Sequence, residues 1–124
     1  NSKSGVNLIR KSARLASIYN SKWYVLYVQT PKESPENIEA SEQRHLMNNF
    51  NLAAELEADV ARIKGRSVPE AIVQFAKEKE VGTIVLGKPN IGFLEQLARN
   101  NILKDLIRLT RNLTIDILII SNHE

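Results

Sequence analysis

Cysteine is absent from this chain of 124 residues. Its absence excludes disulfide bonds, thiolate metal sites and a cysteine nucleophile, and it suits a reducing compartment. The chain has two histidines, His45 and His123, and they lack the spacing of a histidine metal site. No apolar run approaches the length of a membrane span, and no signal-peptide pattern is visible. We therefore expect neither a metal centre nor a transmembrane helix within the sequence.

What is present is the composition of an ordinary globular protein, with 43% hydrophobic and 25% charged residues. The length fits one domain with a real core. The formal net charge of +3 is modest, and acidic residues are interleaved with basic ones along most of the chain. Recognition of nucleic acid calls for a clustered basic surface, so we expect no nucleic-acid partner.

Helical and strand patterns alternate along the chain. Residues 6–19 predict an amphipathic helix with a basic outer face. Residues 23–28 form a continuous apolar run, which is typical of a parallel strand covered on both faces. The remaining expected elements are a helix over 38–57, an edge strand over 59–64, a helix from the capping box at 67–70, a strand over 83–86, a helix over 102–111 and a strand over 113–120. This order predicts an α/β fold, an open parallel sheet with helices on both faces and right-handed crossovers.

The most informative spacing follows the expected strand 83–86. Gly87 is followed by Asn90, Asn100 and Asn101, and a helix is expected to begin at residue 102. A strand, a loop and a helix start in this order can hold a phosphate, because glycine lets the backbone approach the anion and the helix terminus attracts it. Asparagine tolerates the left-handed region, but its side chain fills space that a phosphate would use. The simpler interpretation is that these asparagines form turns and that Asn101 caps the helix.

Two further expectations concern the ends of elements. The first five residues have the composition of a loop that follows a strand, so we expect a first strand to precede them. Gly82 follows the helix that begins near residue 68, at the place where a C-terminal stop is expected.

Five stretches that span nearly the whole chain carry a family resemblance: 8–16, 23–28, 53–56, 84–89 and 103–108. In this order and spacing they resemble the universal stress protein family, and within it the version carried by KdpD-type sensor histidine kinases. In universal stress proteins the loop after the corresponding strand has three glycines and then Ser or Thr, and it holds the phosphates of ATP. Gly87 is the unaltered match. Asn90 and Asn100 occupy positions where the family has glycine, and Asn101 occupies the position where it has Ser or Thr.

The resemblance implies that residues 1–124 form one non-catalytic cytoplasmic regulatory domain of a membrane-bound sensor kinase that controls potassium uptake. The chain has no phospho-acceptor histidine box and no glycine-rich ATP lid, so ATP-dependent phosphotransfer would belong to the parent polypeptide. The implied partners are the other domains of the parent kinase and a second copy, because universal stress proteins commonly dimerise through the last strand, here Leu113 to Ile120. Membrane contact would come only through the parent protein.

The resemblance also implies a nucleotide site, for which cyclic di-AMP and ATP are the candidate ligands. The residues assigned to it are Gly87, Lys88, Asn90, Asn100 and Asn101 of the loop, the backbone of Val28 for adenine, and the pair Ser2 and Ser4, with the aromatic-led strand 23–27, for cyclic di-AMP. Simpler interpretations are that the two serines cap a helix, that Lys88 is solvated and that Trp23 is a core or boundary aromatic.

Three other functions stay open. A free-standing ATP-binding stress protein would need an intact glycine loop, and a pure docking module would need no ligand. An enzyme of the nucleotide α-hydrolase type would use a Ser-Gly-Gly-x-Asp-Ser loop, of which Ser4-Gly5 is a remnant.

Overall fold

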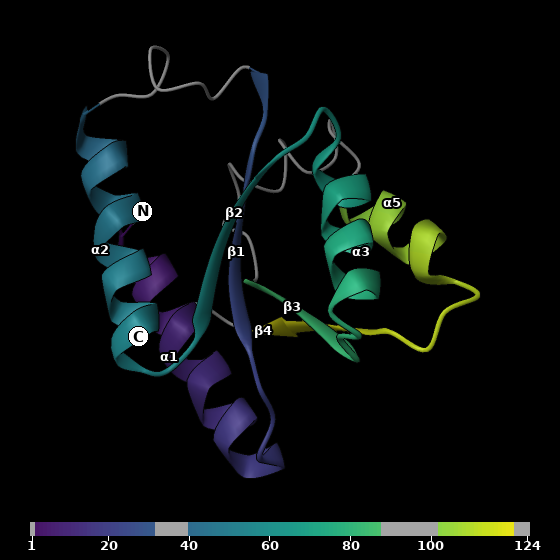
Figure 1. The fold of residues 1–124 in the computed structure, drawn as a ribbon, viewed down its shortest axis with the longest axis horizontal. Coiled ribbons are helices and arrows are strands. Elements are labelled where there is room, and N and C mark those ends of the chain that lie inside the picture. Colours follow the sequence, from purple (N-terminus) through teal and green to yellow (C-terminus); the bar gives the residue numbers. More distant parts are fainter. Residues whose placement is uncertain (1, 32–39, 88–101, 121–124) are drawn as a thin grey trace.

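The computed structural model describes residues 2–31, 40–87 and 102–120 (Figure 1). In chain order its elements are α1 (Ser2–Tyr19), β1 (Tyr24–Gln29), α2 (Ala40–Glu55), β2 (Asp59–Lys64), α3 (Val68–Glu78), β3 (Thr83–Gly87), α5 (Ile102–Thr110) and β4 (Asp116–Ile120). Helices and strands alternate throughout, which confirms the predicted α/β order.

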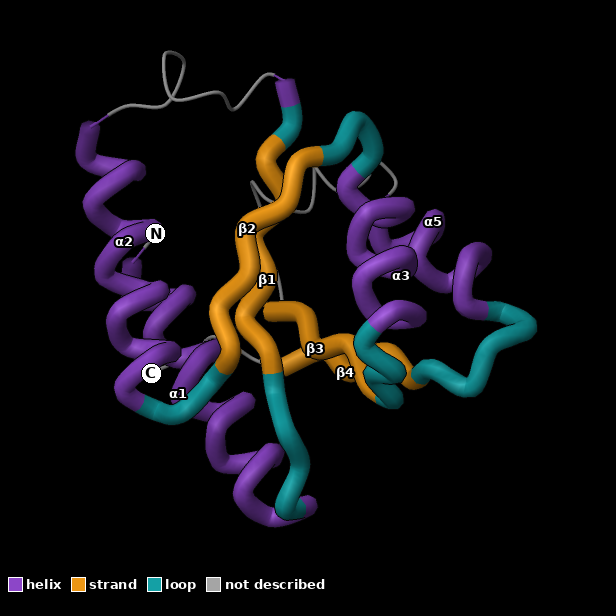
Figure 2. The backbone as a smooth tube through the Cα atoms, in the orientation of Figure 1, coloured by secondary structure: helices purple, strands orange, loops and turns teal. Residues whose placement is uncertain are grey.

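The strands form two parallel pairs. β1 runs beside β2, with Tyr24 opposite Asp59 at the start of the ladder, and β3 runs beside β4, with Thr83 opposite Asp116. In the described part of the chain these pairs are separate two-stranded sheets. α1 and α2 lie on one side of the strands, and α3 and α5 lie on the other (Figures 1 and 2). The predicted parallel arrangement with helices on both faces is therefore confirmed.

β1 is covered on both of its faces, as its continuous apolar sequence predicts. The Tyr24 ring meets the Phe75 ring of α3 edge to face, with centroids 5.4 Å apart. The Tyr27 ring meets the Phe50 ring of α2, with centroids 6.4 Å apart. Residues three positions apart in a strand point to opposite faces, so one tyrosine packs on each helical layer. Edge-to-face ring pairs add about 1 kcal/mol beyond the burial of their area.

The core is made by small and aliphatic side chains from both helical layers and the strands. Its buried hydrophobic residues are Ile9, Val28, Phe50, Ala53, Val73, Ala76, Ile84 and Leu106. Thr110 is buried among them, and its hydroxyl donates a hydrogen bond of 2.7 Å to the Leu106 carbonyl. That bond satisfies the one polar side chain of the described core, which would otherwise cost stability.

Helices α1, α2 and α3 end in the same way, without glycine. A residue one or two positions after each helical end has a positive φ: 51° at Asn20, 68° at Glu57 and 56° at Glu80. The next N–H group donates to a carbonyl five residues back in each case, and the acceptors are Ala16, Ala53 and Ala76 at 2.8, 2.9 and 2.8 Å. These bonds form Schellman motifs, which satisfy carbonyls that a helix end leaves unpaired.

The expectation that Gly82 stops α3 is wrong. The left-handed residue is Glu80, two positions earlier, and Gly82 does not have a positive φ. Because Glu80 carries a Cβ, its left-handed backbone costs roughly 1 to 2 kcal/mol. The hydrogen bond from the Val81 N–H to the Ala76 carbonyl helps to hold it there.

We expect the substitution Glu80→Gly to raise the free energy of unfolding by about 1 kcal/mol, because glycine removes the left-handed penalty and loses part of that gain to backbone entropy. Urea unfolding followed by circular dichroism measures the change. The matched control is Glu78→Gly, inside the last turn of α3, which should lower stability by about 1 kcal/mol. Equal losses in both variants would contradict the assignment of Glu80 to the left-handed position.

The amino-terminal segment also departs from expectation, because α1 begins at Ser2 and residues 2–5 are helical. Gly5 lies where α1 passes close to α2, and a Cβ built on it would collide with the Asn49 amide. Glycine costs a helix about 1 kcal/mol relative to alanine, but packing against a neighbouring helix can outweigh that cost. The loop predicted over residues 1–5 is therefore wrong for Ser2 to Gly5.

Candidate functional site

β3 positions the first residue of the predicted phosphate loop. Gly87 is the last residue of β3, and it lies opposite Ile120 at the carboxyl end of β4. Ligands of open α/β folds bind beyond the carboxyl ends of their strands. α5 begins at Ile102, where the sequence predicts the helix after the loop to begin. The helix after the loop therefore begins where it was predicted, and the strand before the loop ends one residue later than predicted.

The loop itself is not part of the described structure. Lys88, Asn90, Asn100 and Asn101 lie outside the described residues, so their roles stay predictions. Of the loop residues assigned by resemblance, the structure places Gly87 alone.

The other predicted site residues lie on β1 and α1. Val28 is the second-last residue of β1 and is 8% exposed, so its side chain belongs to the core and its backbone alone could meet a ligand. Ser2 and Ser4 are in the first turn of α1. Val28 and Gly87 belong to different strand pairs of the described structure. The predicted residues are therefore not joined in one ladder of the described structure.

The aromatic residues of β1 take part in packing with helices and cations. The Arg62 guanidinium lies 5.8 Å from the centroid of the Tyr27 ring and 5.9 Å from that of the Phe50 ring. Trp23, just before β1, is half-buried, and its carbonyl accepts a hydrogen bond from the Asp59 N–H. Cations over aromatic faces contribute about 0.5 to 1 kcal/mol at exposed positions. These contacts favour the structural interpretation of the aromatic strand.

Lys22 forms an ion pair at the start of β1 and β2 that perturbs its pKa. Its ammonium lies 3.4 Å from a carboxylate oxygen of Asp59 and 5.7 Å from the centroid of the Tyr24 ring. The hydrogen bond to Asp59 raises the pKa of Lys22 above the ordinary value of 10.5. The stabilisation is therefore complete at neutral pH and is lost as the pH rises through the raised pKa. Both side chains are exposed, so this pair is a surface contact and not a catalytic group.

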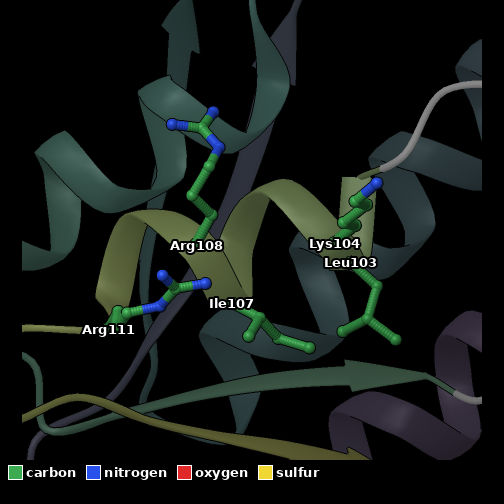
Figure 3. Close-up of a pocket in the computed structure, with 5 residues that line it drawn as sticks. All are labelled: Leu103, Lys104, Ile107, Arg108 and Arg111. Atoms are coloured by element: carbon green, nitrogen blue, oxygen red, sulfur yellow. The ribbon is translucent and has the colours of Figure 1, made fainter.

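Side chains at α5 line a surface hollow. It has a volume of about 350 Å³ and is lined by Leu103, Lys104, Ile107, Arg108 and Arg111 (Figure 3). In the view of Figure 3 the side chains of Leu103 and Ile107 extend at one edge of the hollow, and that of Arg108 extends at the other edge. The hollow thus combines an apolar side with three cations.

Two other kinds of site are not seen in residues 2–31, 40–87 and 102–120. No group of three or more histidine or acidic side chains is placed there to hold a metal ion. None of the helices there combines the length and the apolar character that a membrane crossing requires.

Comparison with known proteins decides the family. The model of the universal stress protein family matches residues 1–120, which is nearly the whole chain. The chain belongs to the universal stress protein family. This confirms the family resemblance that the order of motifs carries.

The universal stress protein domain described here is similar to sensor proteins named KdpD. It is 35% identical over 82 residues to the sensor protein KdpD of Escherichia coli (strain K12), which is 66% of this chain and 9% of that protein. It is 33% identical over 87 residues to the KdpD of Clostridium acetobutylicum, again over 9% of that protein. A putative sensor protein KdpD of Synechocystis sp. is 29% identical over 117 residues, or 30% of its length. The chain therefore matches only a small part of these relatives.

Solved structures confirm the fold. A universal stress protein crystallised in complex with cAMP superposes with a TM-score of 0.64 at 17% identity, over 98% of this chain and 90% of that one. A protein of the same family from Burkholderia pseudomallei gives a TM-score of 0.59 at 16% identity, over 94% of this chain and 86% of that one. At these identities the likeness speaks for the α/β fold of the universal stress protein family.

Sequence reasoning missed the hollow on α5. The pattern that could have indicated it is the pair Leu103 and Ile107, four residues apart, beside basic residues at 104, 108 and 111. Residues at these spacings share one face of a helix. The sequence alone does not say whether such apolar residues are covered, and the structure leaves Ile107 52% exposed.

Proposed function

We propose that this chain is a regulatory domain without catalytic activity of its own, carried by a KdpD-type sensor histidine kinase that controls potassium uptake. The observation that carries the proposal is its similarity to KdpD sensor proteins from three organisms over 66 to 94% of its length. Residues 1–124 then form one domain of a larger kinase. ATP-dependent phosphotransfer belongs to the rest of that polypeptide, and the domain is the cytoplasmic part of an integral membrane protein.

The regulatory ligand proposed for the domain is an adenine nucleotide, with cyclic di-AMP as the first candidate and ATP as the second. The position of Gly87 at the carboxyl end of β3 supports a phosphate site there. A universal stress protein of the same fold has been crystallised with cAMP, which supports nucleotide binding in this fold. Asn90, Asn100 and Asn101 narrow the space for a triphosphate, so the ligand with fewer phosphates per adenine is favoured.

The site would consist of Gly87, Lys88, Asn90, Asn100 and Asn101, with the Val28 backbone at the adenine and Ser2 and Ser4 at the amino end of α1. A ligand regulates only if it binds two states of the kinase with different affinity. The other domains of the parent kinase would be the partners that change state when the ligand binds.

A second proposed partner is another copy of the domain. Leu118 and Ile119 of β4 are 39% and 45% exposed, and an apolar strand at a sheet edge is prone to pair with another strand. We propose a homodimer through Leu113 to Ile120. Sedimentation equilibrium at high protein concentration tests it: a dimer is expected, and a monomer would contradict it.

Calorimetric titration with cyclic di-AMP and with ATP tests the nucleotide proposal. We expect cyclic di-AMP to bind with micromolar affinity and the substitution Gly87→Trp to abolish the binding, because the indole would occupy the space after β3 that the phosphates need. The matched control is Thr83→Trp, at the exposed amino end of the same strand, which should bind like the unaltered protein.

The other outcomes of the titration decide between the alternatives. Tight ATP binding without cyclic di-AMP binding would favour an ATP-binding stress protein over a second-messenger receptor. Failure to bind either nucleotide would overturn the nucleotide proposal and leave a protein-docking module. Loss of binding in Thr83→Trp as well as in Gly87→Trp would place the ligand elsewhere.

A further inference from the structure

The outer face of α5 is formed by Leu103, Lys104, Ile107 and Arg108, together with Arg111 directly after the helix. These residues line a hollow of about 350 Å³ (Figure 3). The opposite side of the same helix is fully used by the core, where Leu106 is 0% exposed and Thr110 is 7% exposed. α5 therefore has a buried face and a second, distinct face.

The side chains of this outer face are arranged in two stripes. Leu103 and Ile107 are four residues apart and border the buried Leu106 and Thr110. Lys104 and Arg108 follow beside them, four residues apart on the helix, and Arg111 is the first residue after the helix. The apolar stripe is not closed over, because Ile107 is 52% exposed.

Among the three cations of this face, an ion pair is described for Arg108. Arg108 lies 3.5 Å from a carboxylate oxygen of Asp105, but both side chains are partly exposed and such a pair contributes little to stability. Within the described ranges, no ion pair is seen for Lys104 or Arg111. A carboxylate on an incoming molecule could therefore pair with these cations at a low cost in lost contacts.

We propose that the outer face of α5 docks an acidic amphipathic helix of a partner protein. Apolar side chains of the partner would enter the hollow against Leu103 and Ile107, and its Asp or Glu side chains would meet the cations at 104, 108 and 111. Helices that dock in this way place anchors at i, i+3, i+4 and i+7, which is the spacing of the stripes on α5.

A helix suits the face better than an anionic membrane does. A hollow with an apolar side and a basic rim receives a protruding anchor residue, as the centres of protein interfaces do. A lipid surface has no such protrusion. The docking needs neither Gly87 nor a nucleotide, so it goes beyond the nucleotide function proposed above.

Fluorescence anisotropy with a labelled synthetic peptide tests the proposal. The peptide has about 16 residues, which is roughly four helical turns, with leucines along one stripe and glutamates beside them. The double substitution Arg108→Glu and Arg111→Glu should weaken binding by about tenfold or more, because it turns attraction into repulsion. The matched control is Arg10→Glu with Arg14→Glu, an equal charge change on exposed residues of α1, which should change affinity by less than about twofold.

A second variant tests the hollow independently of charge. Ile107→Ser removes the apolar contact at an exposed position and should weaken binding by roughly fivefold while leaving the thermal unfolding midpoint almost unchanged. Equal weakening by the α1 and α5 charge reversals would overturn the proposal, since it would indicate general attraction. Equal binding of a peptide with glutamine in place of glutamate would also overturn it. Binding to phosphatidylserine vesicles but not to the peptide would replace it with a membrane contact.

Discussion

The substitution Leu106→Ala is expected to lower the free energy of unfolding by about 3 to 5 kcal/mol, the largest loss of any single change considered for this protein. Leu106 is 0% exposed and lies in the middle of α5. Removing its isopropyl group costs the transfer energy of three carbons and leaves a cavity that the surrounding core fills only in part. The carbonyl of Leu106 also accepts the Thr110 hydroxyl bond, so any local shift disturbs a buried polar group.

Chemical unfolding followed by circular dichroism measures this loss, and the next residue supplies its control. Ile107 has the same number of carbons but is 52% exposed, so Ile107→Ala should cost less than about 1 kcal/mol. A similar loss in both variants would mean that Ile107 is covered in solution. That result would contradict both the burial of α5 and the open hollow beside it.

Phe50→Ala is expected to have the second largest effect, a loss of about 3 kcal/mol, because its ring is not completely buried. Phe50 is 9% exposed and connects α2 to β1 through the Tyr27 ring. Arg62 of β2 lies 5.9 Å from its ring centroid, so the substitution also removes one of the two rings that this cation faces. The loss of ring contacts adds to the loss of buried apolar area.

The same unfolding measurement tests Phe50→Ala, with Met47→Ala as the control. Met47 lies one turn earlier on α2 and is 52% exposed, so its truncation should change stability by less than about 1 kcal/mol. Phe50→Leu should recover more than half of the loss, since it refills most of the volume. If Phe50→Ala lowered the free energy of unfolding no more than Met47→Ala, that result would contradict the packing of α2 on the strands.

The order of elements could be predicted because local chemistry specifies it. Ser67 accepts a hydrogen bond of 3.4 Å from the Glu70 N–H, and Pro69 sits in the first turn of α3, as the capping pattern predicts. The apolar run before Gln29 became β1, and its aromatic residues pack on both faces as a continuous run implies.

The predictions failed where tertiary contacts, and not the local sequence, determine the secondary structure. Residues 2–5 look like a loop because of glycine and serine, but packing of α1 on α2 makes them helical.

The last strand also differs from its prediction. It was expected over 113–120, whereas β4 covers Asp116–Ile120 and the residues before it form a turn. The apolar content of 113–115 favours a strand locally. Pairing with β3 begins at Asp116, opposite Thr83, because β3 itself starts there. The partner strand therefore sets the length of β4.

Less of the candidate site could be predicted than of the fold. Gly87 could be placed at the end of β3 because glycine after an apolar run marks the end of a strand, and the structure agrees. The ligand could not be predicted from that position alone, since the same backbone suits a turn or a phosphate. The outer face of α5 became visible only through burial, because sequence spacing does not distinguish the covered Leu106 from the exposed Ile107.

The measurement that tests the regulatory assignment most directly is the autophosphorylation rate of the proposed parent kinase with and without cyclic di-AMP. It is made on the unaltered protein and on the Gly87→Trp variant. We predict that the nucleotide changes the rate of the unaltered kinase and leaves the variant at its basal rate, because the ligand acts only by binding two states of the kinase with different affinity. An unaltered kinase whose rate is the same at every nucleotide concentration, or a variant that responds as fully as the unaltered protein, would contradict the account.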